Sequence, residues 1–201
     1  MSGFSQIDGV VSDGDVIVHF GDAFREQRRL AGGSAFAPLG DRTVIEVAGP
    51  ERLTWLDSIT SQAVGRLAAG DSTELLVLDP QGRVEHAAGV LDDGASTWLI
   101  VDADDADALA AWLTRMKFRT QATVDIRPDL VLVGYVEGGS VVSTVTAAAS
   151  APNGTALVWA DPWQRISVGG HQYSEVAEHP AADFAWRVAI LEEEAADALA
   201  A

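Results

Sequence analysis

The sequence predicts an α+β fold with a largely antiparallel sheet and packed helices. Apolar runs at 73–79, 84–91 and 96–101 have the spacing of strands, and short turn signals separate them. A helical stripe of apolar residues follows the third run directly. Strands and helices do not alternate strictly along the chain, which argues against a doubly wound parallel sheet.

The first 60 or so residues carry weaker signals. Residues 1–15 are rich in Gly, Ser and Asp, and we predict a mobile segment there. Residues 16–20 predict a short strand and 23–30 a short helix, which the glycines at 32 and 33 end. Residues 41–49 alternate at strand period, and a helix from Pro50 to Ile59 then ends at the polar segment Thr60-Ser61-Gln62.

The remaining elements follow the three central strands. Asp102–Asp105 predicts a helix N-cap, and Leu109, Trp112, Leu113 and Met116 form the buried stripe of that helix at i, i+3, i+4 and i+7. We predict further strands at 123–126, 130–136, 156–160 and 165–168, a weak helix at 140–149 and a closing helix at 181–201.

Composition excludes several kinds of site. The chain has 201 residues, no cysteine and a formal charge of −17. Without cysteine it supplies no disulfide, no Fe–S ligand and no Cys-type zinc site. So acidic a surface repels phosphate backbones and disfavours direct duplex nucleic-acid binding. The N-terminus lacks a secretory pattern and no run of about 18 apolar residues occurs, so we expect a cytoplasmic protein without membrane association.

The sequence predicts no catalytic residue and no metal site. No GxGxxG, P-loop, GxSxG or HExxH motif is present. The four histidines are scattered at 19, 86, 171 and 179. The aspartates at 102–107 lack the glycine and closing glutamate of a calcium loop, so a helix cap is the better interpretation.

Four segments together carry a family resemblance. These are the strand–Gly–helix entry from Val44 to Leu56, the Thr60-Ser61-Gln62 break, the Asp79-x-x-Gly82-x-Val84 hairpin and the Met116-Lys117-Phe118 helix exit. Their order and spacing resemble YgfZ-like folate-binding proteins, which are relatives of the glycine-cleavage T-protein, an aminomethyltransferase. The resemblance covers residues 16–130 well and extends faintly to Trp186-Arg187-Val188-Ala189.

The resemblance implies a folate-binding domain like that of the aminomethyltransferases, with tetrahydrofolate or a related reduced folate in a central channel. It implies that a set of polar, cationic and aromatic residues contacts the folate, namely Arg42, Ser61, Gln62, Arg83, His86, Trp186 and Arg187. Each has a plainer interpretation. Ser61 and Gln62 can satisfy backbone groups in a turn, Arg42 and Arg83 can be solvated, and Trp186 can be a core residue.

The chain departs from the family in three ways. The Lys-Gly-Cys-type signature of YgfZ proteins is absent, and His86 stands where the T-protein has its catalytic aspartate. We also expect the family's C-terminal barrel to be absent. The expected organisation is a mobile segment at 1–15, a folate-binding-like α+β subdomain at 16–128 and a second α+β subdomain at 129–201.

Three functions stay open. The first is a folate-binding accessory protein with a role in the maturation or repair of Fe–S enzymes, including one of tRNA modification, and Fe–S clients as partners. The alternative is a diverged protein-interaction module that has lost the folate pocket. An aminomethyltransferase is least favoured, because a histidine does not reproduce a carboxylate beside the folate nitrogen. Enzymatic activity is left open, with a non-catalytic role favoured.

Overall fold

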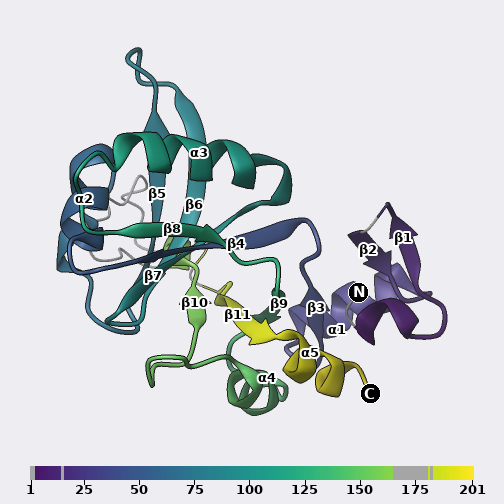
Figure 1. Cartoon of the computed structure of the whole chain (residues 1–201). Helices are drawn as coiled ribbons and strands as arrows, with labels where there is room; N and C mark the ends of the chain where they lie inside the picture. Colours follow the sequence, from purple (N-terminus) through teal and green to yellow (C-terminus); the bar gives the residue numbers. More distant parts are fainter. Residues whose placement is uncertain (1–2, 15, 165–180, 182) are drawn as a thin grey trace.

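Two antiparallel sheets form the body of the molecule (Figure 1). The computed structural model describes residues 3–14, 16–164, 181 and 183–201. The larger sheet has five strands in the order β5-β6-β7-β4-β8, and the smaller has four in the order β10-β11-β9-β3. The α+β class with a largely antiparallel sheet, as the sequence predicts, is confirmed.

The larger sheet contains the three strands predicted at its centre. They are β5 (Ser72–Leu78), β6 (Val84–Asp92) and β7 (Ser96–Asp102), and each pairs antiparallel with the next. The strand β4 (Arg42–Ala48) lies between β7 and β8 (Thr123–Ile126). Gly82 has a φ of 79° in the β5–β6 turn, a conformation that glycine adopts without strain.

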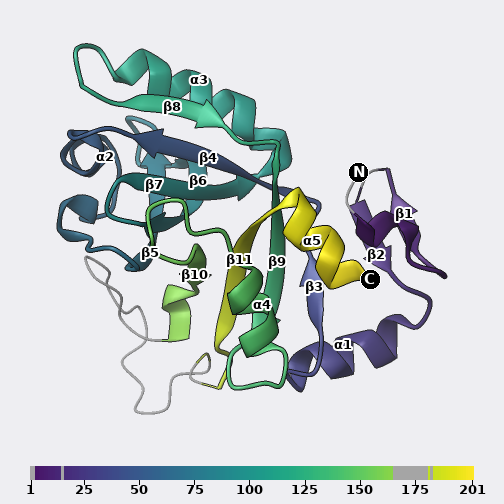
Figure 2. The same ribbon diagram turned by 60° about the horizontal axis from the view of Figure 1, so that its bottom comes forward.

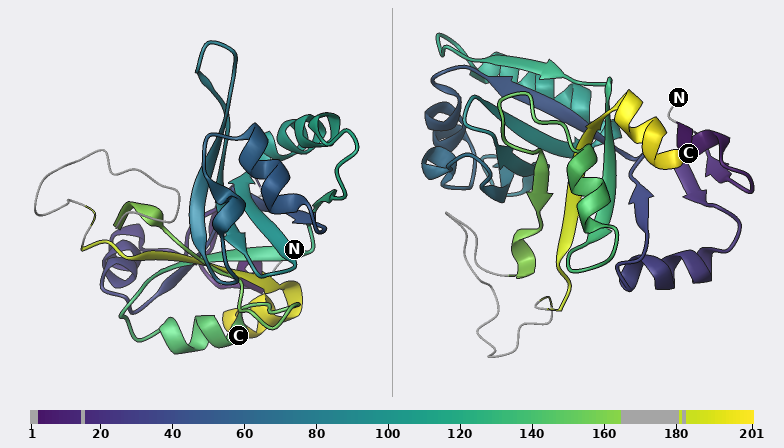
Figure 3. Two further views of the ribbon diagram at one scale, coloured as in Figure 1. Left: turned by 90° about the vertical axis from the view of Figure 1, so that its left-hand side faces the viewer. Right: turned by 90° about the horizontal axis from the view of Figure 1, so that it is seen from below.

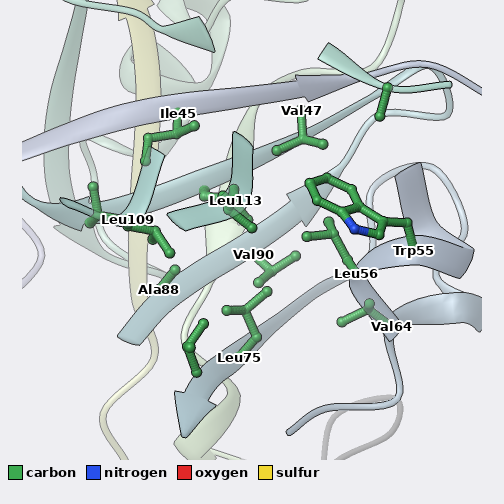
Figure 4. Close-up of a cluster of buried hydrophobic side chains, with 14 of the residues drawn as sticks. Ile45, Val47, Trp55, Leu56, Val64, Leu75, Ala88, Val90, Leu109 and Leu113 are labelled. Carbon is green, nitrogen blue, oxygen red and sulfur yellow. The ribbon is translucent and has the colours of Figure 1, made fainter. Parts of the chain in front are cut away.

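Two helices cover one face of the larger sheet. They are α2 (Arg52–Ile59) and α3 (Ala106–Met116), and Figure 4 shows their side chains meeting those of the strands. Leu109 and Leu113 are buried in this core, as predicted. The prediction for Met116 is wrong, because its side chain is 45% exposed at the end of the helix. Trp112 is only partly buried.

The C-terminal segment of the smaller sheet differs most from the sequence prediction. We predicted a helix over 181–201, but Trp186–Glu192 forms β11, and only Glu193–Ala200 is helical, as α5. The strand lies between β10 (Val158–Ala160) and β9 (Leu130–Val136), so pairing on both sides overrides its helix-compatible composition. The predicted helix at 140–149 is present as α4 (Val142–Ala148).

The two sheets pack face to face over a second core (Figure 2). The larger sheet contributes side chains such as Leu91 and Trp98, and the smaller contributes Leu132, Val188 and Ile190. A short strand, β3 (Phe36–Pro38), joins the edge of the smaller sheet by pairing with β9. The chain then passes directly from β3 into β4 of the larger sheet.

The N-terminal segment lies beside the smaller sheet (Figure 3). It comprises the 3₁₀ turn η1 (Gly3–Gln6), the hairpin β1 (Val11–Asp13) and β2 (Val16–His19), and α1 (Ala23–Ala31). We expected mobility over residues 1–15 and did not anticipate that Phe4 is buried against Phe36, their ring centroids 6.1 Å apart. The predicted strand at 165–168 lies outside the described residues.

Polar side chains are buried where β6 turns into β7. Asp92 accepts hydrogen bonds from both Arg52 Nε and Nη2 and from Thr97 Oγ1. Asp93 is 3% exposed. Burial alone would raise the pKa of Asp93, but hydrogen bonds from the backbone of Ser96, the side chain of Asn153 and other donors lower it. No helix among the described residues has the length and apolar character needed to cross a membrane.

Candidate functional site

The smaller sheet touches the edge of the larger one where β10 lies across β5. Trp159 Nε1 donates a hydrogen bond of 2.8 Å to the Thr73 carbonyl oxygen. The backbone N–H of Ala160 donates to Ser72 Oγ at 3.1 Å. These contacts fix β10 against β5, and because β10 also pairs with β11, side chains of all three strands meet there. We call this place the β5–β10–β11 junction.

Glu74 is the carboxylate of this junction. It lies on β5 directly opposite Gly89 of β6, on the face that looks toward β10. Its Oε2 accepts a hydrogen bond of 3.0 Å from Trp163 Nε1. The ring of Trp159 covers Gly89 so closely that a Cβ there would lie 3.0 Å from the indole. Glu74 therefore binds one tryptophan, Trp163, and lies opposite a glycine that a second tryptophan, Trp159, covers.

The electrostatics of Glu74 are unusual for a surface carboxylate. Burial raises its pKa, the negative charge of Asp161 raises it further, and the hydrogen bond from Trp163 partly offsets both. In the part of the chain that the structure describes, no arginine or lysine forms an ion pair with Glu74 or Asp161. Among the described residues, these two acids thus lie close together in an aromatic surrounding without an ion-pair partner from arginine or lysine.

Trp186 extends the aromatic surface along β11. Its ring stacks on Phe184 with centroids 5.8 Å apart and planes 5° from parallel. Its carbonyl oxygen accepts a hydrogen bond from Asp161 N–H, which links it to the acid pair. The ring also covers Gly134 on β9, where a Cβ would lie 2.1 Å from it. Of the seven residues predicted to bind folate, Trp186 thus lies at this junction.

Arg187 points the other way. Successive side chains of a strand face opposite sides of its sheet, and Trp186 faces the core between the sheets. Arg187 forms an ion pair with Glu137 instead, and its side chain is 14% exposed. The two residues are adjacent in sequence but present their side chains on opposite faces.

Ser61 and Gln62 bind the free edge of β5. Ser61 Oγ accepts a hydrogen bond from Leu76 N–H at 3.1 Å, and Ser61 N–H donates to the Leu76 carbonyl. Gln62 Nε2 donates to Thr73 Oγ1 at 3.0 Å, on the face that α2 and α3 cover. Ser61 therefore pairs with backbone groups of β5, whereas Gln62 binds a side-chain hydroxyl instead of a backbone group.

His86 pairs with the residue that directly precedes α3. Its Nδ1 lies 2.8 and 2.9 Å from the two carboxylate oxygens of Asp105. The sequence predicted that Asp102–Asp105 would cap this helix, but the Asp105 carboxylate makes no cap hydrogen bond. Arg42 pairs with Asp102 at 2.7 Å close by, and Arg83 is exposed in the β5–β6 turn.

The predicted residues do not converge on one cavity. His86 and Gln62 lie on the side of the larger sheet that α2 and α3 fill, whereas Trp186 lies on the side that faces the smaller sheet. Sequence reasoning missed Glu74, Trp159 and Trp163. The signal available was the density of aromatic residues near the end of the chain, where three of the six tryptophans fall. Among the described residues no cluster of three potential metal ligands occurs.

Comparison with solved structures identifies the fold. The chain is similar to the aminomethyltransferase T of the glycine cleavage system from Bartonella henselae, with 17% identity over 87% of this chain and 47% of that one, and a TM-score of 0.59. The chain spans about half the length of that enzyme. The aminomethyltransferase-like fold that the sequence resemblance implied is therefore confirmed, and identity this low speaks for the fold alone.

Two further structures are similar at lower scores. The regulatory subunit of aspartate kinase from Thermus thermophilus aligns with 14% identity over 83% of this chain and 93% of that one, at a TM-score of 0.39. The heterotetrameric sarcosine oxidase from Corynebacterium sp. U-96 aligns with 13% identity over 89% and 94%, at 0.41. Scores of this size establish no common fold. No protein-family model and no curated protein sequence matches the chain.

Proposed function

We propose that this chain is a cytoplasmic protein that binds a reduced folate and does not turn it over. The observation that carries the proposal is Glu74, a half-buried carboxylate that binds Trp163 and lies opposite the Gly89 covered by Trp159, on an aminomethyltransferase-like fold. The sequence resemblance to folate-binding proteins supports the same ligand.

The chemistry of a pterin suits this junction. One edge of the pterin ring presents an amino group and a ring N–H side by side, and a carboxylate accepts both as a pair of parallel hydrogen bonds. The flat ring gains stacking against the indole of Trp163, which is half exposed. Two hydrogen-bond donors beside Glu74 would also offset the repulsion from Asp161 that raises its pKa.

The chain has no carboxylic acid at the position where the resemblance places the catalytic aspartate of the aminomethyltransferase. His86 stands where the related enzyme has its aspartate, and its Nδ1 is already held by Asp105. A histidine in that place does not supply a permanent carboxylate to the folate nitrogen. A folate at Glu74 lies on the other face of the larger sheet from His86 and Asp105, so neither side chain reaches it, and we expect it to be held without transfer of an aminomethyl group.

The family resemblance extends the proposal to a cellular role. YgfZ-like proteins are linked to the maturation or repair of Fe–S enzymes, including one that modifies tRNA. A chain without cysteine has no ligand of its own for such a cluster. The role we propose is thus that of an accessory protein that brings a folate to an Fe–S client.

Isothermal titration with tetrahydrofolate tests the proposal. We expect a dissociation constant of roughly 10 μM to 1 mM, or about −7 to −4 kcal/mol. Glu74→Gln should weaken binding, while the matched change Glu194→Gln, on the exposed side of α5, should not. If Gln62→Ala or Arg187→Ala weakens binding and Glu74→Gln does not, the folate lies at the residues first predicted. Absence of heat and of a thermal shift at saturating folate would overturn the proposal.

A protein-interaction module is the second candidate. It is favoured by one observation, namely that the predicted folate residues lie on different faces and satisfy partners within the chain. Under this alternative the fold persists while the pocket is lost. This alternative would be established if the chain does not bind folate but does bind a defined Fe–S enzyme.

A further inference from the structure

A cavity of about 520 Å³ lies beside the N-terminal segment. Its walls come from η1, β2, α1, β3 and the last turn of α5, which Figures 2 and 3 show gathered on one side of the molecule. None of its lining residues belongs to the β5–β10–β11 junction. Ligand binding in this cavity is therefore independent of the proposed folate site.

The walls of this cavity are mostly apolar. They include large side chains from five elements, among them Phe4, Ile17, Phe20, Leu30, Phe36 and Leu199. Val18 also lines the cavity and is 60% exposed, so part of its apolar wall faces solvent. Water held against such walls finds few hydrogen-bond partners, and an apolar ligand that displaces it is stabilised.

A few polar groups border the cavity on one side. The carboxylate of Glu26 already accepts hydrogen bonds of 2.9 Å from the N–H groups of Phe20 and Asp22. His19 Nδ1 accepts from Gly21 N–H at 3.0 Å, so in the neutral ring the proton sits on Nε2, which is then a donor. Arg29 adds a guanidinium whose Nη2 is 3.5 Å from the Ser34 carbonyl. The side-chain donors among the lining residues are thus His19, Gln27 and Arg29, and of these only Arg29 is permanently charged.

We propose that this cavity binds a small amphipathic carboxylate of the medium-chain fatty acid type. The volume lies within the ordinary range for small-molecule sites, which is roughly 300–1,000 Å³. The unbranched tail lies along Phe4, Ile17 and Leu30, and the carboxylate meets Arg29 and His19 at the rim.

Charge supports an anionic head at this place. The whole chain carries −17, yet α1 holds three arginines, at 25, 28 and 29, in a single short helix. The two oxygens of Glu26, the acid of this helix, are engaged by backbone N–H groups. A guanidinium and a carboxylate form charge-assisted hydrogen bonds, which are stronger than neutral ones.

Titration with decanoate, followed by NMR chemical shifts of the whole chain, tests the proposal. We expect saturable shifts in residues of α1, β2 and β3, and affinity that rises about fourfold for each added methylene from hexanoate to decanoate. Arg29→Gln should weaken decanoate binding about tenfold. Arg28→Gln is the matched control, because Arg28 lies on the same helix but does not line the cavity, and it should leave binding unchanged.

A second pair of variants tests the tail. Leu30→Trp fills the cavity and should abolish binding, whereas Phe24→Trp, at a side chain that is 83% exposed and outside the cavity, should not. The proposal is overturned if decanoate causes no saturable shift, if decanol binds as tightly as decanoate, or if Arg28→Gln and Arg29→Gln weaken binding equally. It is also overturned if the lining residues prove to be covered by a second copy of the chain in solution.

Discussion

Arg52 of α2 and Asp92 at the end of β6 form a buried ion pair with two parallel hydrogen bonds, of 3.0 and 2.7 Å. The side chains are 9% and 1% exposed. The pair joins the covering helix to the last residue of a strand in the larger sheet. Arg42 and Asp102 form a comparable contact of 2.7 Å on the surface, with side chains 43% and 64% exposed.

Removal of the buried partner should therefore cost far more than removal of the exposed one. Arg52→Ala leaves the Asp92 carboxylate buried without its cation, which typically costs about 3–5 kcal/mol. Arg42→Ala breaks a solvated pair and should cost less than about 1 kcal/mol. Urea unfolding of both variants measures the difference. Equal losses would mean that Asp92 regains its hydrogen bonds from water or neighbouring groups.

Glu74→Gln should raise the melting temperature near neutral pH. The pKa of Glu74 is raised above its ordinary 4.5 by burial and by Asp161, so the folded state disfavours the charged form. Its contribution to stability is therefore full below about pH 4.5 and is lost as the pH rises through the folded pKa. Glutamine keeps an acceptor for Trp163 and carries no charge.

The change in melting temperature caused by Glu74→Gln should depend on pH. Differential scanning at several pH values should show the gain of Glu74→Gln shrinking as the pH falls, and vanishing below 4.5, where Glu74 becomes protonated in both the folded and the unfolded state. A gain that is constant with pH would show that charge is not its cause. Asp107→Asn, an exposed acid on α3, serves as the comparison and should change little.

Asp93→Asn should destabilise the protein by about 3 kcal/mol at neutral pH. The carboxylate accepts from Ser96 N–H, Trp98 Nε1 and Asn153 Nδ2, and an amide at this position turns one acceptor into a donor. Because the folded pKa is lowered below 3.8, the stabilisation is present above that pH and is lost as the pH falls through the folded pKa. The penalty should shrink on acidification, as equilibrium denaturation can show.

Gly134→Ala should be destabilising although alanine suits a strand better than glycine. A Cβ at residue 134 would lie 2.1 Å from the Trp186 ring, so either the ring or β11 must move, at a cost of about 1–3 kcal/mol. Replacing Trp186 by Leu in the same chain should recover much of the loss. Chemical denaturation of the single and double variants gives the coupling directly. Additive losses would contradict this packing.

Local patterns were sufficient to predict most strands of this fold. In the segments that form β5, β6 and β7, the apolar residues either alternate with polar ones or form a continuous apolar run, and both patterns are typical of strands. β11 was missed because Arg187, Ala189 and Leu191 are equally compatible with a helix, and only pairing with β9 and β10 makes them a strand. Met116 fits the helical period, but it is the last residue of α3 and its side chain is exposed.

The candidate site was less predictable for a similar reason. Nothing near Glu74 in the sequence distinguishes it from other strand residues, because its tryptophan neighbours come from a distant segment of the chain. His86 and Gln62 were predicted to bind folate from a family resemblance. Such a resemblance predicts the order of motifs along the chain, but it does not predict which way each side chain points. Residues on opposite faces of a sheet can stand at neighbouring positions in such a motif.

The pairing of β3 with β9 bears on how this protein is made. Phe36–Pro38 leaves the ribosome early, but its partner strand at 133–135 is synthesised only after the entire larger sheet. Until β9 has been synthesised, β3 has no strand to pair with. The contact between β3 and β9 closes a long loop of chain, and such long-range contacts slow folding. Fragments that end before β9 should thus expose Phe36 and depend on chaperones, however complete their larger sheet is.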